Sequence, residues 1–186
     1  MTRLRQGSHL RRCSGGQAGG ARFLARWRVF LGFVFAAIAL WLATPTPTTL
    51  MIGGVISVIG ELIRVWAAGH LEKSREVTRS GPYQFTRHPL YLGSSFIGIG
   101  FAIAANHLVV AVIVVAYLLL TLTAAMRSEE AHLREKFGDA YDAYIERRSA
   151  PMERRFSVQR AISNREHHAI GGLLAALLLL LAKSLR

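Results

Sequence analysis

Long apolar segments alternate with polar stretches along the 186 residues of the chain. Five such segments can be distinguished, at residues 29–43, 50–68, 90–105, 108–126 and 169–182. A helix needs about 20 apolar residues to cross the hydrocarbon core of a bilayer, so the first, third and fifth segments need their flanking residues to span it. We expect an all-α protein, a polytopic membrane bundle of about five transmembrane helices. The first segment also fits the apolar region of a signal peptide, but no clear small-residue cleavage site follows, which favours a retained helix.

The third and fourth apolar segments are separated only by Asn106 and His107. So short a link predicts a tight helical hairpin over residues 90–126. A hairpin returns the chain to the side from which it came. The residues after 126 are therefore expected beside those before 90.

Lysine and arginine are concentrated in three of the polar stretches. The chain has 23 Lys and Arg against 11 Asp and Glu, a net charge of +12. Seven of the basic residues precede residue 29, four lie in 69–89 and nine in 127–168, whereas 44–49 and 106–107 contain none. The positive-inside rule then places the amino terminus and the basic loops in the cytoplasm and the carboxyl terminus outside. Because the charges lie between apolar segments, they favour anionic lipid over nucleic acid as the partner.

These patterns divide the chain into three parts. Residues 1–28, rich in glycine and arginine, are expected to form a disordered basic cytoplasmic arm on anionic lipid. Residues 29–168 are expected to form the membrane core, and residues 169–186 an additional carboxyl-terminal transmembrane helix. The expected location is the cell (inner) membrane, crossed several times, and no obligate protein partner is evident. The single cysteine, Cys13, excludes an internal disulfide.

The stretch GPYQFTRHPLYLG, residues 81–93, leads into the third apolar segment. Its two prolines bias the residues before them away from the α-helical region, and Pro89 suits the first position of a helix. A helix start with interfacial tyrosine and arginine anchors would explain part of this composition. It would not explain the imidazole, aromatic ring and glycine of His88, Tyr91 and Gly93 at one helix end. We interpret this stretch as one wall of a pocket.

A second group of polar residues begins where the fourth segment ends, in MRSEEAHLREKFGDAYDAY, residues 126–144. Glu129 and Glu130 emerge from an apolar helix into a region dominated by arginine, and they point about 100 degrees apart around that helix. Gly138 predicts the helix end, before a short cytoplasmic amphipathic helix that carries two tyrosines. Since the hairpin brings this stretch back to the GPYQFTRHPLYLG turn, we predict a cytoplasmic pocket of carboxylates, an imidazole, aromatic rings and arginines.

The ordered set of motifs resembles a known family. RHPLYLG (87–93), preceded by GPY (81–83) and followed by EE (129–130), FG (137–138) and two tyrosines, is similar to the isoprenylcysteine carboxyl methyltransferases and the related phospholipid methyltransferases. The resemblance covers roughly residues 61–151. It implies a polytopic membrane enzyme that binds S-adenosylmethionine at the cytoplasmic ends of its helices and takes a lipophilic substrate from the bilayer.

The resemblance also implies roles for individual residues. The residues implied to bind the cofactor are Tyr83, Arg87, His88, Pro89, Tyr91, Gly93, Glu129 and Glu130. The residues implied for catalysis are His88, Glu129 and Arg147, with adjacent Arg148 as the alternative match to the arginine of the family. Two features depart from the family pattern: the proline-rich stretch after this arginine is reduced to SAPM, and the last apolar segment lies outside the matched region.

The groups of S-adenosylmethionine suit these residue types. Its ammonium and ribose suit carboxylates, its carboxylate suits arginine or the amides of an irregular turn, and aromatic rings can hold its adenine or its sulfonium. A carboxylate acceptor needs no general base, whereas an amine or hydroxyl acceptor could use His88 or a glutamate. The acceptor stays open between a prenylated thiol carboxylate, a phospholipid amine and a similar amphiphile.

Two other classes of protein fit part of the pattern. A sterol-type membrane reductase also uses an arginine-histidine-proline turn, with NADPH as its cofactor. A non-catalytic membrane scaffold would bind anionic lipid through the basic loops. The acidic pair favours the methyltransferase.

Charged residues elsewhere give weaker signals. Glu61 and Arg64, inside the second apolar segment, are three residues apart and could pair on one helix face, for structure or for function. Glu166 is followed by His167 and His168, but adjacent helical side chains point in different directions and no further ligand cluster accompanies them. We therefore predict no metal site.

Overall fold

The computed structural model describes residues 30, 32, 34–73, 75–150 and 152–185. Its helices are α2 (Pro47–His70), the short 3-10 helix η1 (Gly81–Gln84), α3 (Pro89–Ala105), α4 (Leu108–Phe137), α5 (Asp139–Ile145), α6 (Val158–Ser163) and α7 (Glu166–Ser184). Residues 30, 32 and 34–42 are helical as well, and the described ranges contain no strand, which confirms the all-α prediction for them. The predicted basic arm, residues 1–28, lies outside the described residues.

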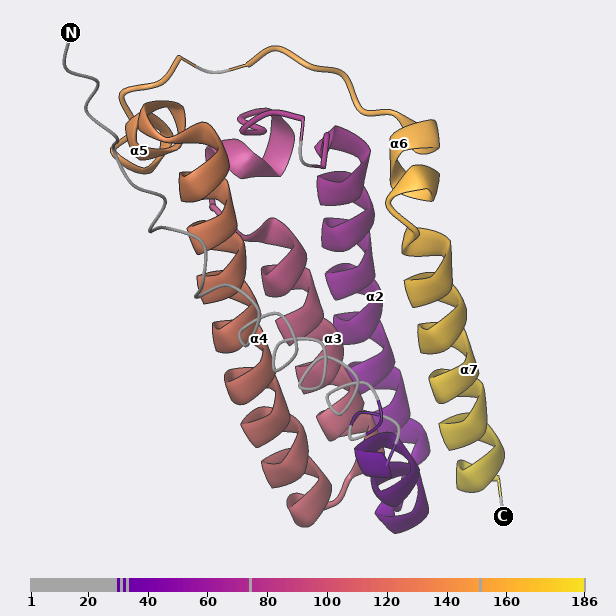
Figure 1. Ribbon diagram of the computed structural model, residues 1–186. Helices are drawn as coiled ribbons and strands as arrows, with labels where there is room; N and C mark the ends of the chain where they lie inside the picture. The colour runs from indigo at the N-terminus through magenta and orange to yellow at the C-terminus, as the bar shows by residue number, and fades with distance from the viewer. Residues whose placement is uncertain (1–29, 31, 33, 74, 151, 186) are drawn as a thin grey trace, which may run out of the picture. The chain divides into compact units, whose positions relative to one another are not determined.

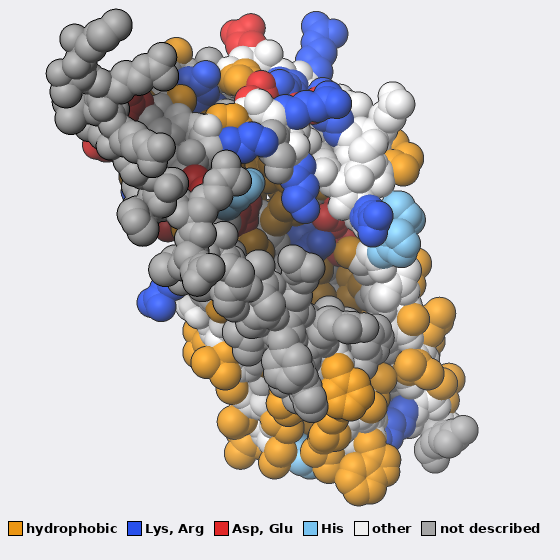
Figure 2. Space-filling view, viewed as in Figure 1, with side chains coloured by type: hydrophobic (Ala, Val, Ile, Leu, Met, Phe, Trp, Pro, Cys, Tyr) orange, Lys and Arg blue, Asp and Glu red, His pale blue; other side chains and the backbone are white. Residues whose placement is uncertain are grey.

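The chain divides into two units, Met1–Ile38 and Ala39–Arg186, and every contact discussed below lies within the second. In that unit α4, α3, α2 and α7 lie side by side in this order (Figure 1). The short helices α5 and α6 and the turn η1 lie at one end of these four helices. We call this end the charged end, because lysine, arginine and acidic side chains gather there (Figure 2).

Three helices of this unit, α2, α4 and α7, are long and apolar enough to cross a membrane. With 17 residues, α3 is shorter. Large apolar side chains on these helices are exposed, including Leu62, Val112, Leu119, Leu174 and Leu178, and hydrophobic side chains dominate the view away from the charged end (Figure 2). Apolar flanks of this kind match a lipid environment. An integral membrane protein is therefore confirmed, while the number of five spans stays a prediction.

The predicted hairpin is present. Helix α3 ends at Ala105 and α4 begins at Leu108, and Asn106 adopts the left-handed conformation, with φ 49°, that reverses the chain. Thr44 is bound to the same turn: its hydroxyl donates to the Asn106 backbone carbonyl at 2.9 Å, and the Asn106 side-chain Nδ2 donates to the Thr44 carbonyl at 3.1 Å. The two stretches that lack basic residues thus meet at one end, as the charge pattern requires.

Helices α2 and α3 approach each other closely because glycine faces glycine along their contact. A Cβ on Gly60 would lie 2.6 Å from the Gly93 carbonyl oxygen, and a Cβ on Gly93 would lie 2.6 Å from the Gly60 carbonyl oxygen. Gly53 and Gly100 repeat this arrangement further along the same two helices. Small residues permit such backbone proximity between membrane helices. The contact fixes where α3 begins relative to α2.

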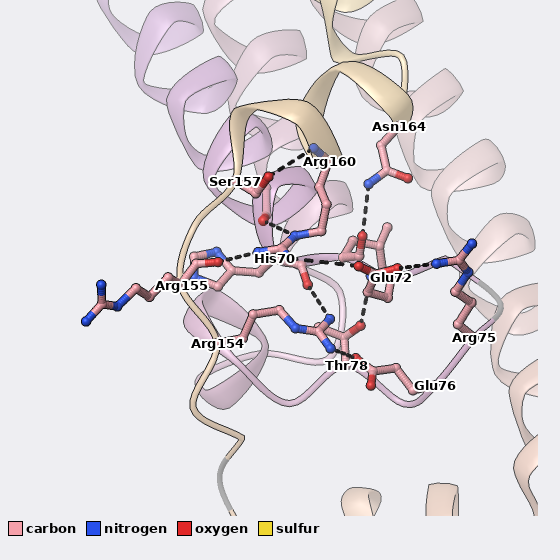
Figure 3. Close-up of polar contacts among 12 residues, drawn as sticks. His70, Glu72, Arg75, Glu76, Thr78, Arg154, Arg155, Ser157, Arg160 and Asn164 are labelled. Atoms are coloured by element: carbon pink, nitrogen blue, oxygen red, sulfur yellow. Dashed lines mark hydrogen bonds and ion pairs between the residues drawn. The ribbon is translucent and has the colours of Figure 1, made fainter.

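The carboxyl end of α2 is held by the segment that leads into α7 (Figure 3). Arg160 Nε donates to the Gly69 carbonyl at 2.8 Å, Asn164 Nδ2 donates to the Ala68 carbonyl at 2.9 Å, and Arg154 donates to the His70 carbonyl at 3.3 Å. The last carbonyls of a helix have no partner within the helix, so these side chains satisfy them. We call residues 154–164 the α2 clamp. The clamp determines where α7 starts.

Candidate functional site

A cavity of about 320 Å³ opens at the charged end, between the η1 turn, the start of α3, the last turns of α4, and α5. Its lining comes from stretches far apart in the sequence, which the hairpin brings together as predicted. The described residues that line it are Tyr83, Gln84, Phe85, Thr86, Arg87, His88, Glu130, Tyr144, Ile145 and Arg147.

The central contact of the cavity joins His88 and Glu130. His88 is the residue before α3, which begins at Pro89, and its Nε2 lies 2.8 Å from Glu130 Oε1 on α4. The His88 side chain is 16% exposed and that of Glu130 is 36% exposed, so both groups reach the cavity from partly buried positions. The Tyr91 ring lies 5.7 Å from the His88 ring, centroid to centroid, and braces it from within α3. The pair is thus a polar contact between the two predicted motifs.

Two tyrosines join the η1 turn to α5. The Tyr144 hydroxyl donates to the Tyr83 carbonyl at 2.8 Å, so α5 holds the turn that forms one wall. Burial raises the pKa of the Tyr83 phenol above its ordinary value, and the negative charges of Glu129 and Glu166 raise that pKa further. Burial also raises the pKa of Tyr144, while Arg87 lowers it. Both phenols therefore stay protonated at neutral pH and can act as hydrogen-bond donors.

Tyr141 lies behind this wall. Its side chain is 1% exposed, and its hydroxyl has no hydrogen-bond partner among the described residues. Burial raises the pKa of Tyr141 to about 12, with Glu130 as the next contribution in the same direction. A buried polar group without a partner is costly, and the negative charge of Glu130 further disfavours ionisation of this hydroxyl.

Two arginines supply the positive charge of the cavity. Arg87 and Arg147 are exposed residues that line it. Arg147 adopts a left-handed conformation with φ 57° directly after α5, where the chain turns. Arg148 instead pairs with Glu146, Nε to Oε2 at 2.5 Å. Of the two candidates for the family arginine, Arg147 is therefore the one at the cavity.

The structure separates the predicted site residues into two groups. Tyr83, Arg87, His88, Glu130 and Arg147 line the cavity, whereas Pro89, Tyr91, Gly93 and Glu129 are not among the described lining residues. Pro89 starts α3 and is buried. Gly93 faces α2 rather than the cavity, so the space beside it is filled by Gly60 and Arg64. Glu129 affects the site electrostatically, since its negative charge raises the pKa of Tyr83.

A buried ionic cluster lies next to these residues, and sequence reasoning found only two of its three members. Arg64 Nε lies 3.8 Å from Glu61 Oε2, which confirms that these residues share a helix face. The principal partner of Arg64 is Glu166, which accepts from Nη2 at 3.0 and 3.1 Å and from Nε at 3.2 Å. The signal in the sequence that could have identified Glu166 was an acidic residue three positions before the last apolar segment. The described residues hold no group of three or more His, Cys, Asp or Glu side chains suited to a metal ion.

Two known proteins are similar in sequence to much of this chain. A nickel-cobalt-cadmium resistance protein of Alcaligenes xylosoxydans xylosoxydans is 30% identical over 135 residues, which cover 67% of this chain and 61% of that protein. A cobalt-zinc-cadmium resistance protein of Cupriavidus metallidurans is 30% identical over 149 residues, 74% of this chain and 66% of that protein. The matches thus span less than two thirds of the length of either relative. No solved structure matches.

The phospholipid methyltransferase family model matches residues 27–140, more than half of the chain. The match includes the α3–α4 hairpin with His88 and Glu130, while α6 and α7 lie beyond it. The family resemblance inferred from the sequence motifs is confirmed: the chain belongs to the phospholipid methyltransferase family.

Proposed function

We propose that this protein is an integral membrane methyltransferase that uses S-adenosylmethionine and methylates a lipophilic acceptor. The observation that carries the proposal is the His88–Glu130 contact of 2.8 Å, in a cavity that two arginines also line, in a member of a methyltransferase family. A lipid scaffold or a reductase accounts less well for these observations, because the family to which the chain belongs is one of methyltransferases.

The cavity residues fit the charged and polar groups of S-adenosylmethionine. Glu130 suits the ammonium or the ribose hydroxyls, Arg87 and Arg147 suit the carboxylate, and Phe85, which is 75% exposed, offers a ring for the adenine. A volume of about 320 Å³ lies within the usual range of ligand pockets. The cofactor supplies an electrophilic methyl group on a sulfonium.

The protein contributes positioning and the exclusion of water. Glu130 Oε1 accepts a hydrogen bond from His88 Nε2–H and so fixes the imidazole in the cavity wall, while Tyr144 fixes the η1 turn. An oriented, partly buried site lowers the barrier of a bimolecular displacement through proximity and desolvation. For an amine or hydroxyl acceptor, His88 is the candidate base through Nδ1, because Nε2 carries the proton donated to Glu130.

The location of the site supports a membrane-derived acceptor. The cavity lies at the charged end of helices whose exposed flanks are apolar. We propose that this end faces the cytoplasm, where S-adenosylmethionine is made, and that the basic loops contact anionic lipid. The acceptor enters from the bilayer, and no obligate protein partner is proposed.

Equilibrium binding to the purified full chain in nanodiscs tests the function. S-adenosylhomocysteine should bind saturably and NADPH should not, and His88→Phe should weaken the binding of S-adenosylhomocysteine while the protein still inserts. Tighter binding of NADPH would favour the reductase. No binding of either ligand would favour the scaffold and would refute the methyltransferase.

The names of the two relatives favour a physiological role that we add to this proposal: methylation by this enzyme contributes to resistance to divalent metal cations. Growth of a host that expresses the wild-type chain, compared with one that expresses His88→Phe, can be measured in graded cobalt and cadmium salts. Protection that requires His88 is expected. Equal protection by both proteins, at equal expression, would show that the resistance does not depend on His88 and would contradict this role.

A further inference from the structure

A path of hydrogen bonds leads from α7 to the first turn of α3. Glu166, the first residue of α7, accepts from Arg64 Nη2 at 3.0 and 3.1 Å and from Arg64 Nε at 3.2 Å. Arg64 Nη1 donates to the Ser94 hydroxyl at 2.5 Å, and this hydroxyl donates to the Leu90 carbonyl at 2.9 Å. The side chains of Arg64 and Glu166 are 21% and 7% exposed, so water competes little for these bonds. The path connects α7, α2 and α3.

The path ends beside His88. Leu90 lies in the first turn of α3, which begins at Pro89. The Leu92 amide donates to the His88 carbonyl at 3.0 Å, and the Tyr91 ring lies against the His88 ring. The orientation of this turn therefore determines where the His88 imidazole lies in the cavity.

The two carboxylates near Arg64 differ in what they can fix. Glu61 Oε2 lies 3.8 Å from Arg64 Nε, which is too far for a hydrogen bond, and neither carboxylate oxygen of Glu61 has a hydrogen-bond partner among the described residues. Glu166 binds two nitrogens of the planar guanidinium and so fixes its orientation. Glu166 is therefore the carboxylate that directs Nη1 of Arg64 to Ser94.

Loss of Glu166 would leave Arg64 with a different partner. The Arg64 stem packs on the backbone of α3 at Gly93, where a Cβ would lie 2.6 Å from Arg64 Cγ. Glu61, three residues earlier on α2, is the other described carboxylate within 4 Å of this guanidinium. Without Glu166 we expect the guanidinium to turn to Glu61 as an i,i+3 pair, which would deprive Ser94 of its donor.

Helix α7 lies outside the region that the family model matches, which ends at residue 140. The α2 clamp holds the segment before α7 on the end of α2 (Figure 3). We propose that Glu166 is a positioning residue of the cavity: through Arg64 and Ser94 it fixes the first turn of α3, and with it the imidazole at the cavity. This inference rests on the proposed methyltransferase function, which makes the cavity the cofactor site.

Binding of S-adenosylhomocysteine to the full chain in nanodiscs tests the path, at a temperature where every variant is folded. Glu166→Gln and Ser94→Ala should each weaken binding about three- to tenfold. Two matched controls should keep the wild-type Kd. Glu61→Gln removes the other carboxylate beside the same guanidinium, and Ser95→Ala removes a hydroxyl that donates to the Tyr91 carbonyl at 3.0 Å outside the path. An unchanged Kd in Ser94→Ala, or an equal loss in either control, would overturn the proposal.

The double variant of Glu166→Gln and Ser94→Ala tests whether the two residues act through one path. It should bind no more weakly than the weaker of the two single variants, because each substitution interrupts the same path. Losses that multiply would mean independent effects and would overturn the proposal. If Glu166→Gln does not fold, the comparison of Ser94→Ala with Ser95→Ala decides.

The imidazole provides a second readout that needs no ligand. The ¹⁵N signal of His88, assigned by its absence in His88→Phe, is recorded on histidine-labelled protein. Glu166→Gln should shift this signal and Glu61→Gln should not, whereas a merely structural role of Glu166 would lower Tm and leave the signal of the folded protein in place. A wild type that binds no S-adenosylhomocysteine would refute the methyltransferase, and the His88 signal would still decide the positioning role.

Discussion

The two adjacent glutamates of the acidic pair should differ in their importance for cofactor binding, although the sequence treats them alike. Glu130 lines the cavity and contacts His88 at 2.8 Å, whereas Glu129 is not among the described lining residues. A hydrogen bond to a charged group contributes about 1.5 to 3 kcal/mol. Because the Glu130 side chain is 36% exposed, water competes for it and the lower end applies. Glu130→Gln should therefore cost about 1.5 kcal/mol, roughly tenfold in Kd.

The assay is equilibrium binding of radiolabelled S-adenosylhomocysteine to the full chain in nanodiscs. Glu129→Gln should change Kd less than Glu130→Gln does, and Glu135→Gln, exposed on the same helix, should leave it unchanged. In a double-mutant cycle with His88→Gln, the two substitutions should couple by about 0.5 to 3 kcal/mol because the side chains touch. A wild-type Kd in Glu130→Gln, or a larger loss in Glu129→Gln, would refute the assignment of Glu130 to the cofactor.

Three further predictions concern packing, pH and topology. Gly93→Val should abolish accumulation of folded protein, because the new Cβ would lie 2.6 Å from the Gly60 carbonyl oxygen and 2.6 Å from Arg64 Cγ. The control Gly54→Val should fold, because a Cβ at Gly54 meets nothing within 4 Å. Equal yields of the two variants would contradict the close α2–α3 contact. The pKa of Tyr141 is about 12 in the folded protein against 10.0 ordinarily, because burial disfavours the phenolate. Its ionisation leaves stability unchanged below pH 10 and should lower it between about pH 10 and 12, so Tm should fall less steeply there in Tyr141→Phe. Cysteine labelling should report the cytoplasm in 69–87 and 127–168 and the outside in 44–49 and 106–107; cytoplasmic loops labelled from outside would reject the orientation.

The membrane helices and the hairpin could be predicted because each depends on local sequence. Apolar length identifies the spans, and the two residues Asn106 and His107 leave room only for a reversal. The meeting of His88 with Glu130 follows from that reversal, since antiparallel helices return the end of α4 to the start of α3. Motifs on two consecutive helices could therefore be assigned to one site before their distance was known.

The role of Gly93 could not be predicted from its position in a motif. A small residue at a helix end fits two explanations, a space for a ligand and a space for a neighbouring helix, and the sequence does not distinguish them. The backbone contact with Gly60 decides for the helix. The same limit applies to Glu166, because its partner Arg64 lies 102 residues earlier and only tertiary packing brings them together.

The contact of α2 with α3 explains why the cavity and the ionic cluster occur together. Gly60 and Gly93 set the separation of the two helices, and the residues on either side of this contact point are Glu61 and Arg64 on α2 and His88 and Ser94 on α3. A larger residue at either glycine would move the α3 end of the cavity away from the α2 carboxylate by the width of a methyl group or more. The positions of the Glu61–Arg64 pair and of His88 thus depend on one helix spacing. Helix α4 contributes Glu130 to one side of this pair of helices and α7 contributes Glu166 to the other.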